Sequence, residues 1–219
     1  MEIVKNLGLE AYRLRLLRGL DEQLQALGFS SLAGVDEAGR GCLAGPVVAA
    51  AVIMRPDHLM PGVDDSKQLT SVQREGLSRA IRSTAVATSV AAVSPAIIDD
   101  INILEATRRA MSLALDGLQP QPDCAVIDAV KLPKRQYRSL SLVRGDVVSY
   151  SVACASILAK VERDRLMLDL DREYPHYGFV RNKGYGAAEH REALMKYGPS
   201  PVHRLTFRSV VPRVLEVAR

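Results

Sequence analysis

Four acidic residues of this 219-residue chain stand where they could take part in chemistry. Asp36 and Glu37 directly follow an apolar run, and Asp128 and Asp146 each lie at or just beyond the end of another apolar segment. In open α/β sheets, ligands bind beyond the carboxyl ends of the strands. A single aspartate in such a place is usually a helix cap or a turn residue, but three strand ends of this kind favour convergence of the acids on one site.

Carboxylates that converge cannot all remain ionised on their own. Two unit charges about 4 Å apart repel by roughly 4 kcal/mol at an effective dielectric constant near 20, so either some are protonated or cations neutralise them. Oxygen ligands without clustered Cys or His favour Mg²⁺ or Mn²⁺. We therefore expect a divalent-metal site, with two ions that activate water and stabilise the leaving oxygen at a phosphodiester.

The histidines favour metal-activated water over an alternative ribonuclease chemistry. An enzyme that uses the 2′-hydroxyl of its substrate as the nucleophile typically needs a pair of histidines as base and acid. This chain has scattered histidines, none of them next to a candidate acid in the sequence: His58, His176, His190 and His203.

The adjacency of Asp36 and Glu37 raises a geometric problem. Neighbouring residues of a regular strand point to opposite faces, so both side chains cannot reach one site from an ordinary pleat. Either Glu37 has already left the strand, or it contributes mainly through its backbone carbonyl. The sequence leaves both possibilities open.

The glycines that follow have two interpretations. Residues 39–44 fit G-x-G-x-x-A, the dinucleotide-binding fingerprint, with Asp57 at the end of the next strand. That fingerprint needs a helix to open at the glycines, whereas Gly45-Pro46 and the strand-like VVAAAVI follow at once. We favour a close approach of main-chain groups to a ligand, such as the 2′-hydroxyl that distinguishes RNA from DNA. Arg40 would then hold a phosphate.

The elements that must position these residues alternate between strands and helices, which predicts an α/β fold in one domain over residues 1–219. Residues 47–54 lack polar alternation and suit a strand buried on both faces, and we also expect a buried strand at 84–93. Asn102 is the expected cap of a helix that ends near residue 115. The other expected strands are 32–36, 124–129 and 140–143, and the other helices are 9–27, 69–82, 149–170 and 187–197.

Composition bounds the class of protein. Its 47% hydrophobic and 25% charged residues are ordinary for a globular chain. The longest apolar run, 47–54, is too short to cross a bilayer, and no signal peptide is evident. The widely spaced Cys42, Cys124 and Cys154 favour free thiols in a reducing compartment. We therefore expect a cytoplasmic monomer without membrane contact.

Charge is distributed unevenly along the chain. Residues 175–219 contain eight Lys/Arg against three acidic residues, whereas the preceding part is nearly neutral. A basic C-terminal segment of this kind suits a polyanionic partner.

Motifs in a fixed order carry a resemblance to a known family, bacterial ribonuclease HII, over about residues 32–207. They are GVDEAGRGCLAGPVVAAAVI, DDSKQL, NILEATRRAM, VIDAVKLP, RGD, SVACASILAKVERDRLM and YPHYGFVRNKGYG. The resemblance implies an RNase H-like mixed sheet flanked by helices, with a helical C-terminal extension at about 175–219. Residues 1–30 lie outside it as an N-terminal helical extension. It also implies an enzyme that cleaves RNA in RNA–DNA hybrids and nicks duplex DNA 5′ of an embedded ribonucleotide, leaving a 3′-hydroxyl and a 5′-phosphate.

The resemblance also assigns roles to individual residues. It identifies the four acids as metal-binding catalytic residues, and Gly39, Arg40 and Gly41 as the segment that senses the ribose. Tyr185 matches a tyrosine that stacks at the junction between ribonucleotide and deoxyribonucleotide, although an ordinary loop tyrosine is the alternative. Contacts with the nucleic-acid backbone or support of the site are implied for Ser66, Lys67, Asn102, Lys160, Arg181 and Lys183. Lys160 suits a plain surface charge equally well.

Four positions depart from the family pattern. Asp128 is followed by Ala129 and Val130 where Gly and Asn are usual, Asn182 replaces a common His, and Tyr150 replaces a smaller aliphatic residue. Loss of the Asn amide removes a polar group near the metals. Two rival functions stay open. One is a nuclease of the same superfamily directed at DNA, and the other is a hybrid-binding protein whose catalysis has decayed because of the Ala129-Val130 change.

Overall fold

A five-stranded mixed sheet forms the centre of the protein, whose computed structural model describes residues 2–210. The strand order is β3-β2-β1-β4-β5; β2 runs antiparallel to β1 and β3, and β4 runs parallel to β1 and β5. The sequence-based expectation of a mixed α/β sheet is thus confirmed. The strands are β1 Leu32–Ala38, β2 Val47–Ile53, β3 Ala87–Val93, β4 Cys124–Asp128 and β5 Arg138–Leu142.

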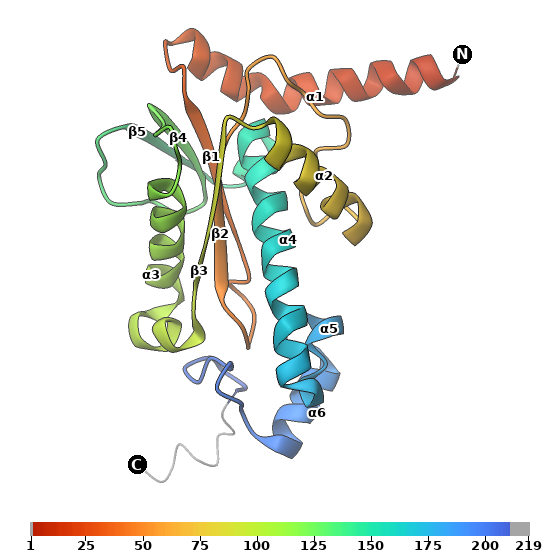
Figure 1. Cartoon of the computed structure of the whole chain (residues 1–219), viewed down its shortest axis with the longest axis vertical. Helices are drawn as coiled ribbons and strands as arrows, with labels where there is room; N and C mark the ends of the chain where they lie inside the picture. Colours follow the sequence, from red (N-terminus) through yellow and green to blue (C-terminus); the bar gives the residue numbers. More distant parts are fainter. Residues whose placement is uncertain (1, 211–219) are drawn as a thin grey trace.

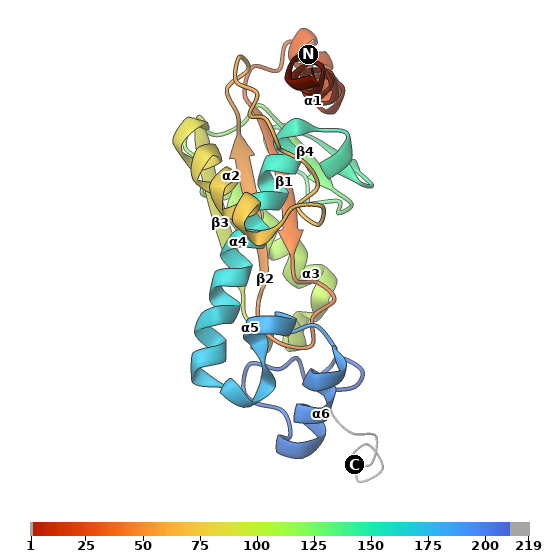
Figure 2. The same ribbon diagram turned by 90° about the vertical axis from the view of Figure 1, so that its right-hand side faces the viewer.

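Helices cover both faces of the sheet (Figure 1). Helix α3 packs on one face and α4 on the other, with α2 against the outer side of α4. Helix α1 crosses one end of α4, while α5 and α6 gather at the opposite end (Figures 1 and 2). The helices are α1 Glu2–Ala26, α2 Ser71–Thr84, α3 Pro95–Asp116, α4 Tyr150–Glu173, α5 Phe179–Asn182 and α6 Ala188–Tyr197, with 3₁₀ turns η1 Gly145–Val147 and η2 Pro175–Tyr177.

The strands β2 and β3 differ in burial because they differ in position. Every residue of β2 is buried, as its continuous apolar run predicts for a strand covered on both faces. The expectation of a second buried strand at 84–93 is wrong, since β3 begins at Ala87 and only Ala87 and Val93 are buried. β3 is an edge strand with a neighbour on one side alone, so it is covered less completely.

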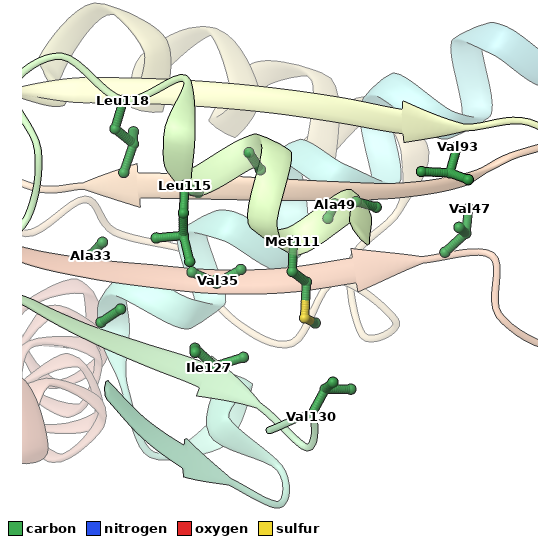
Figure 3. Close-up of a cluster of buried hydrophobic side chains, with 14 of the residues drawn as sticks. Ala33, Val35, Val47, Ala49, Val93, Met111, Leu115, Leu118, Ile127 and Val130 are labelled. Carbon is green, nitrogen blue, oxygen red and sulfur yellow. The ribbon is translucent and has the colours of Figure 1, made fainter. Parts of the chain in front are cut away.

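The core under α3 joins all the central strands. Val35 of β1, Ile127 of β4 and Met111 and Leu115 of α3 are buried together in it (Figure 3). Val130, which takes the place of the expected Asn, belongs to the same cluster and is 3% exposed. The departure from the family pattern therefore places an apolar side chain in the core, just after the third acid.

Helix α4 lies directly against β1, and Gly34 permits this contact. A Cβ at position 34 would lie 2.0 Å from the backbone carbon of Ser151, which is closer than atoms can approach. The first half of α4 is made of small residues and is buried over its length. Close packing of this kind holds the start of α4, and the turn before it, next to the acidic end of β1.

Helix α1 is an integral part of this side of the protein. Leu14 and Leu17 are buried in the core cluster that α4 forms with β2. The carboxylate of Asp21 is also buried, and it accepts hydrogen bonds from Ser149 Oγ at 2.6 Å and from the N–H and Oγ of Ser151 at 2.9 and 2.8 Å. The N-terminal helix therefore caps the first turn of α4.

The basic C-terminal segment contains helical elements up to Tyr197, as expected: the short turns η2 and α5, and the helix α6. An isolated antiparallel bridge joins Ala44 to His203, so this segment also contacts the glycine-rich stretch after β1. Residues 211–219, the last part of the expected extension, lie outside the described residues. Among residues 2–210, no helix is both long and apolar enough to cross a membrane.

Candidate active site

Three of the four predicted acids converge at the end of the sheet. Asp36 and Glu37 of β1 and Asp128 of β4 each offer a carboxylate oxygen, and these oxygens all lie within 4.8 Å of one another. The parallel register explains the meeting, since Val35 is paired with Ile127 and the next residue on each strand is an aspartate. The expected convergence at the strand ends is confirmed for this trio.

Glu37 reaches the trio from inside the strand. It is paired with Ala49 in the ladder between β1 and β2, so the suggestion that Glu37 has already left the strand is wrong. Its carboxylate, and not only its carbonyl, belongs to the cluster. The side chain of Glu is one methylene longer than that of Asp and stands one residue before the end of β1, which allows the carboxylate to bend back towards Asp36.

Asp146 borders the trio without being one of its members. It is buried in the turn η1, and the preceding residue, Gly145, donates its N–H to Asp128 Oδ1 at 2.6 Å. Burial raises the pKa of Asp146, and the charges of Asp65 and Asp128 raise it further. The fourth acid is therefore an electrostatic neighbour of Asp128, but its carboxylate lies outside the group of three.

It is electrostatically unfavourable for these carboxylates to be buried close together. Burial raises the pKa of Asp36 well above its usual range, with Glu37 and Asp128 adding to the effect. Burial also raises the pKa of Glu37, although the Arg40 guanidinium, 3.3 Å from Glu37 Oε1, opposes this rise. The charges of Asp36 and Glu37 are disfavoured by loss of water and by neighbouring carboxylates, so a bound cation would stabilise them.

The donor atoms fit a hard divalent cation. Glu37 Oε2 is buried and has no hydrogen-bond partner among the described residues 2–210, so within them it is an acceptor without a donor. The converging ligand atoms are carboxylate oxygens alone, which suits Mg²⁺ or Mn²⁺ better than zinc or copper. An unpartnered buried carboxylate oxygen costs free energy unless something neutralises it, and a metal ion does so.

Two residues implied by the family resemblance lie at the acids. Lys67 Nζ stands 3.8 Å from Asp146 Oδ2 and 3.8 Å from Asp65 Oδ1. Burial alone would lower the pKa of Lys67, but these carboxylates together raise it. Ser66 is buried, and its hydroxyl lies 2.8 Å from that of Ser156 on α4. Asp65 was not among the candidate residues, although it stands in the same DDSKQL motif.

Two buried arginines, which the sequence analysis did not single out, hold the glycine-rich stretch. Arg204 donates to the carbonyls of Gly39 at 2.7 Å and Arg40 at 2.9 Å, and twice to that of Gly45. Burial lowers the pKa of Arg204 to about 10, so it remains charged at neutral pH. These hydrogen bonds from Arg204 therefore fix the segment that contains the proposed ribose-sensing residues.

Arg163 on α4 joins this stretch to the loop of Tyr185. It donates to the carbonyls of Ala44 at 3.2 Å, Pro46 at 3.1 Å and Lys183 at 2.9 Å. No local sequence signal marks Arg163 or Arg204, because each acts on backbone atoms more than a hundred residues away in the chain. The helical spacing of apolar residues predicts the helix that carries Arg163, but it does not predict the contacts that Arg163 makes.

Tyr185 stands at the edge of the same region, and the residue is 46% exposed. The guanidinium carbon of Arg163 lies 5.9 Å from the centre of the ring, and Lys160 Nζ lies 6.0 Å from it. The preceding carbonyl, that of Gly184, accepts from Leu43 N at 2.8 Å. Tyr185 and the glycine-rich stretch are thus held together, and a half-exposed aromatic ring near two cations is a suitable surface for a nucleic-acid base.

Three further candidates use their polar groups within the protein. The guanidinium of Arg181 pairs with Glu189 at 2.8 Å, on a side chain that is 69% exposed. Lys183 adopts a left-handed conformation, and its carbonyl binds Arg163. Asn102 has φ 67° and caps the main part of α3, accepting from the N–H groups of residues 104 and 105 at 2.9 and 3.1 Å. The capping expectation for Asn102 is confirmed.

The other departures from the family pattern have structural consequences. Asn182 is buried, donates to Tyr177 O at 2.7 Å and accepts from Gly184 N at 2.8 Å, so it shapes the loop before Tyr185. The hydroxyl of Tyr150 accepts from Met60 N at 2.8 Å. Ala129 has φ 53°, a conformation that favours glycine and disfavours alanine.

Comparison with known proteins places the chain in a family. The family model described as Ribonuclease HII matches residues 33–210. The Ribonuclease HII of Chloroflexus aurantiacus is 50% identical over 203 residues, which are 90% of this chain and 96% of that protein. The Ribonuclease HII of Syntrophomonas wolfei is 48% identical over 206 residues, 94% of this chain and 81% of that protein.

A solved structure agrees with this result. The crystal structure of ribonuclease H2 from Pyrococcus horikoshii OT3 superposes with a TM-score of 0.72 at 28% identity, covering 86% of this chain and 98% of that one. The mixed sheet, its flanking helices and the helical C-terminal region are therefore those of an RNase H-like fold. By the extent of these matches, the chain belongs to the ribonuclease HII family of type 2 ribonuclease H endoribonucleases.

Proposed function

We propose that this chain hydrolyses RNA in RNA–DNA hybrids and nicks duplex DNA on the 5′ side of an embedded ribonucleotide, leaving a 3′-hydroxyl and a 5′-phosphate. Two Mg²⁺ or Mn²⁺ ions would be held by Asp36, Glu37 and Asp128, with Asp146 at their border. The observation that carries this proposal is the trio of carboxylate oxygens within 4.8 Å, beside a glycine-rich stretch whose carbonyls are bound by buried arginines.

The acids prepare the site for the reaction. Asp36 and Asp128 lie on neighbouring parallel strands, and Glu37 contributes a buried oxygen that no donor binds in the part of the chain that the structure describes. When bound there, divalent ions would supply a water of lowered pKa and neutralise charge on the leaving oxygen. The chain itself fixes the donors in advance, so little reorganisation is needed as charge develops.

Selection for a ribonucleotide would come from main-chain groups and one aromatic ring. A Cβ built at Gly41 would meet no atom within 4 Å, so open space lies over this exposed glycine. The carbonyls of Gly39 and Arg40 bind Arg204, so the main-chain groups that would approach a 2′-hydroxyl are the N–H groups of residues 39–41 and the carbonyl of Gly41. A 2′-hydroxyl is both a donor and an acceptor. Tyr185 would stack on the sugar–base unit that follows.

Cations around the acids would position the phosphates. Arg40 lies next to Glu37 with its side chain 40% exposed, and Lys67 lies next to Asp146 with its side chain 78% exposed. Both groups are within the site yet reachable from outside. Contacts of this kind place the backbone without reading its sequence.

One assay tests the proposal against its rivals. Duplexes with a single ribonucleotide, with a long RNA–DNA hybrid and with DNA alone are incubated with Mg²⁺ or Mn²⁺, and in parallel with a chelator. We expect cleavage of the first two substrates only, lost with the chelator. Equal cleavage of the all-DNA duplex would point to a DNA-directed nuclease, and tight binding without cleavage would point to a binding protein whose catalysis has decayed.

Three broader expectations remain predictions. The chain is predicted to fold as one domain over residues 1–219, to be monomeric and to act in the cytoplasm. Light scattering after size exclusion tests the monomer, a single cooperative unfolding transition tests the domain, and cell fractionation tests the location.

A further inference from the structure

Two histidines far apart in the sequence meet inside the C-terminal region. His190 on α6 and His203 in the segment that follows are 0% and 2% exposed. Their Nε2 atoms lie 3.0 Å apart, a hydrogen-bond distance. Neither ring belongs to the acidic site, and the proposed reaction assigns them no part.

The ring nitrogens that face away from the other histidine have fixed partners, and these partners determine the direction of every hydrogen bond in the pair. The N–H of Ser200, which can only donate, points at His203 Nδ1 at 3.0 Å. His203 Nδ1 is therefore an acceptor, and in a neutral ring the proton is on Nε2. His203 then donates to His190 Nε2, which leaves the proton of His190 on Nδ1.

The chain of hydrogen bonds ends at Tyr185. His190 Nδ1 lies 2.8 Å from the carbonyl oxygen of Tyr185, so this ring donates to that peptide group. All four ring nitrogens thus have a partner within the protein, and no nitrogen is left for acid–base work on a substrate. The arrangement suits a structural link between residue 200 and Tyr185.

Aromatic neighbours keep the two rings in place. Tyr177 packs edge-on to His203, with 4.6 Å between ring centres, and Phe179 packs edge-on to His190 at 5.4 Å. The Tyr177 hydroxyl donates to Gly198 O at 2.8 Å. The nearby carboxylate, that of Glu189, is bound by Arg181. The rings therefore have little freedom to turn or to be solvated.

We propose that His190 and His203 form a neutral positioning pair that fixes the peptide of Tyr185 and so holds its ring at the ribonucleotide junction. This inference rests on the proposed stacking role of Tyr185. Neither histidine touches the substrate. Their effect is on how well the site distinguishes one ribonucleotide in DNA from a long hybrid.

The charge state of the pair agrees with the geometry. Burial lowers the pKa of His190. Burial lowers the pKa of His203 to about 4, and the neighbouring His190 contributes to the lowering. Both rings are therefore neutral at neutral pH, as the hydrogen-bond directions require.

Substitution of each histidine by Asn or by Gln tests the direction of the hydrogen bond that it donates. The terminal nitrogen of Asn can take the place of Nδ1, and that of Gln can take the place of Nε2. At position 190, His190→Asn keeps a donor towards Tyr185, whereas His190→Gln loses it. At position 203 the order reverses: His203→Gln keeps the donor towards His190, and His203→Asn loses it.

The measured quantity is kcat/KM on a single-ribonucleotide duplex divided by kcat/KM on a long hybrid. A loss of folded protein lowers both values equally and leaves this ratio unchanged. Because stacking on an aromatic ring is worth about tenfold or more, we expect the ratio to fall about tenfold in His190→Gln, His203→Asn and Tyr185→Ala. It should stay within about twofold of the parent in His190→Asn and His203→Gln.

The outcomes separate this inference from the proposed function. If Tyr185→Ala lowers the ratio but the amide variants at each position behave alike, the positioning pair is refuted and the role of Tyr185 stands. If Tyr185→Ala leaves the ratio unchanged, the junction role fails and the positioning pair fails with it. If the variants at one position do not fold, the comparison of the ratio between Asn and Gln at the other position still tests the positioning pair.

Discussion

The N–H of Gly145 donates a 2.6 Å hydrogen bond to Asp128 Oδ1, so the third acid directly holds the turn that carries the fourth. This bond uses one of the oxygens of Asp128, and a carboxylate oxygen of the same residue belongs to the trio with Asp36 and Glu37. Strand β4 and the turn η1 are therefore coupled at the site. Removal of the whole Asp128 carboxylate would therefore affect both the charge of the site and the turn that carries Asp146.

Substitution of Asp128 separates these two effects. Asp128→Asn keeps an oxygen that can accept from Gly145 but removes the negative charge. We expect cleavage to fall by about a thousandfold or more, since metal-ion stabilisation is worth several kcal/mol. The melting temperature should stay at or above that of the parent. Asp116→Asn, in an exposed residue paired with Arg135 at the end of α3, serves as the control; undiminished turnover in Asp128→Asn would refute the assignment.

The raised pKa of Asp36 predicts that the site is unstable without metal. A carboxyl group whose pKa is raised on folding stabilises the protein below its unfolded pKa, and this contribution is lost as pH rises through the folded pKa. At neutral pH in a chelator, Asp36→Asn should therefore unfold at a higher temperature than the parent. Mg²⁺ should stabilise the parent and have little effect on the variant. Equal metal-induced shifts in both proteins would argue against a metal role for Asp36.

Two glycines of the same segment should respond differently to alanine. A Cβ at Gly39, which has φ 95°, would lie 1.9 Å from Arg163 Nε, whereas a Cβ at Gly41 would meet no atom within 4 Å. Gly39→Ala is expected to lower the free energy of unfolding by at least about 2 kcal/mol. Gly41→Ala should leave stability within about 0.5 kcal/mol.

The functional result at Gly41 then tests the ribose contact. If main-chain groups at this position approach the 2′-hydroxyl, the added methyl group should lower kcat/KM on both ribonucleotide substrates about tenfold or more. Urea unfolding and cleavage are measured on the same preparations. Full activity in a normally folded Gly41→Ala would count against close approach there.

His203 predicts a specific loss of stability in acid. The unfolded chain binds a proton at His203 as pH falls through about 6.5, but the folded chain resists protonation until about pH 4. More protons are bound to the unfolded state between these values, so stability falls as pH is lowered across this window. At about pH 5 the contribution lost is about 2 kcal/mol.

The comparison with His203→Gln isolates this effect. The acidic site titrates in both proteins, and its contribution cancels in their difference. The stability advantage of the parent over the variant should shrink between about pH 7 and pH 5 in urea unfolding. A difference that does not change with pH would show that His203 is not held neutral.

Asp21 predicts that the N-terminal helix stabilises the catalytic domain. Its buried carboxylate accepts three hydrogen bonds at the start of α4. Asp21→Ala removes a cap and leaves buried donors unpaired, at a cost of about 2 kcal/mol in the free energy of unfolding. Glu22→Ala, at the exposed neighbour that pairs with Arg18, should cost no more than about 0.5 kcal/mol. Equal effects of the two substitutions would contradict the capping role.

Local pattern in the sequence determined much of this protein. The apolar runs before Asp36 and Asp128 mark strands because a strand buried on both faces needs no polar alternation. Acids at the ends of such strands predict a shared site because parallel neighbours end at the same edge of the sheet. The Asn102 cap follows in the same way, since its side chain bonds only to residues two and three positions away.

The tertiary structure alone decided the finer geometry. Whether Glu37 remains in β1 depends on its pairing with Ala49, and the offset of Asp146 depends on the bond between Gly145 and Asp128. Arg204 lies 165 residues from Gly39, and His203 lies 13 residues from His190 on a different element. Periodicity reports which face of an element is buried, but it carries no information about which distant groups meet there. Such contacts form only when the whole chain has folded around its core.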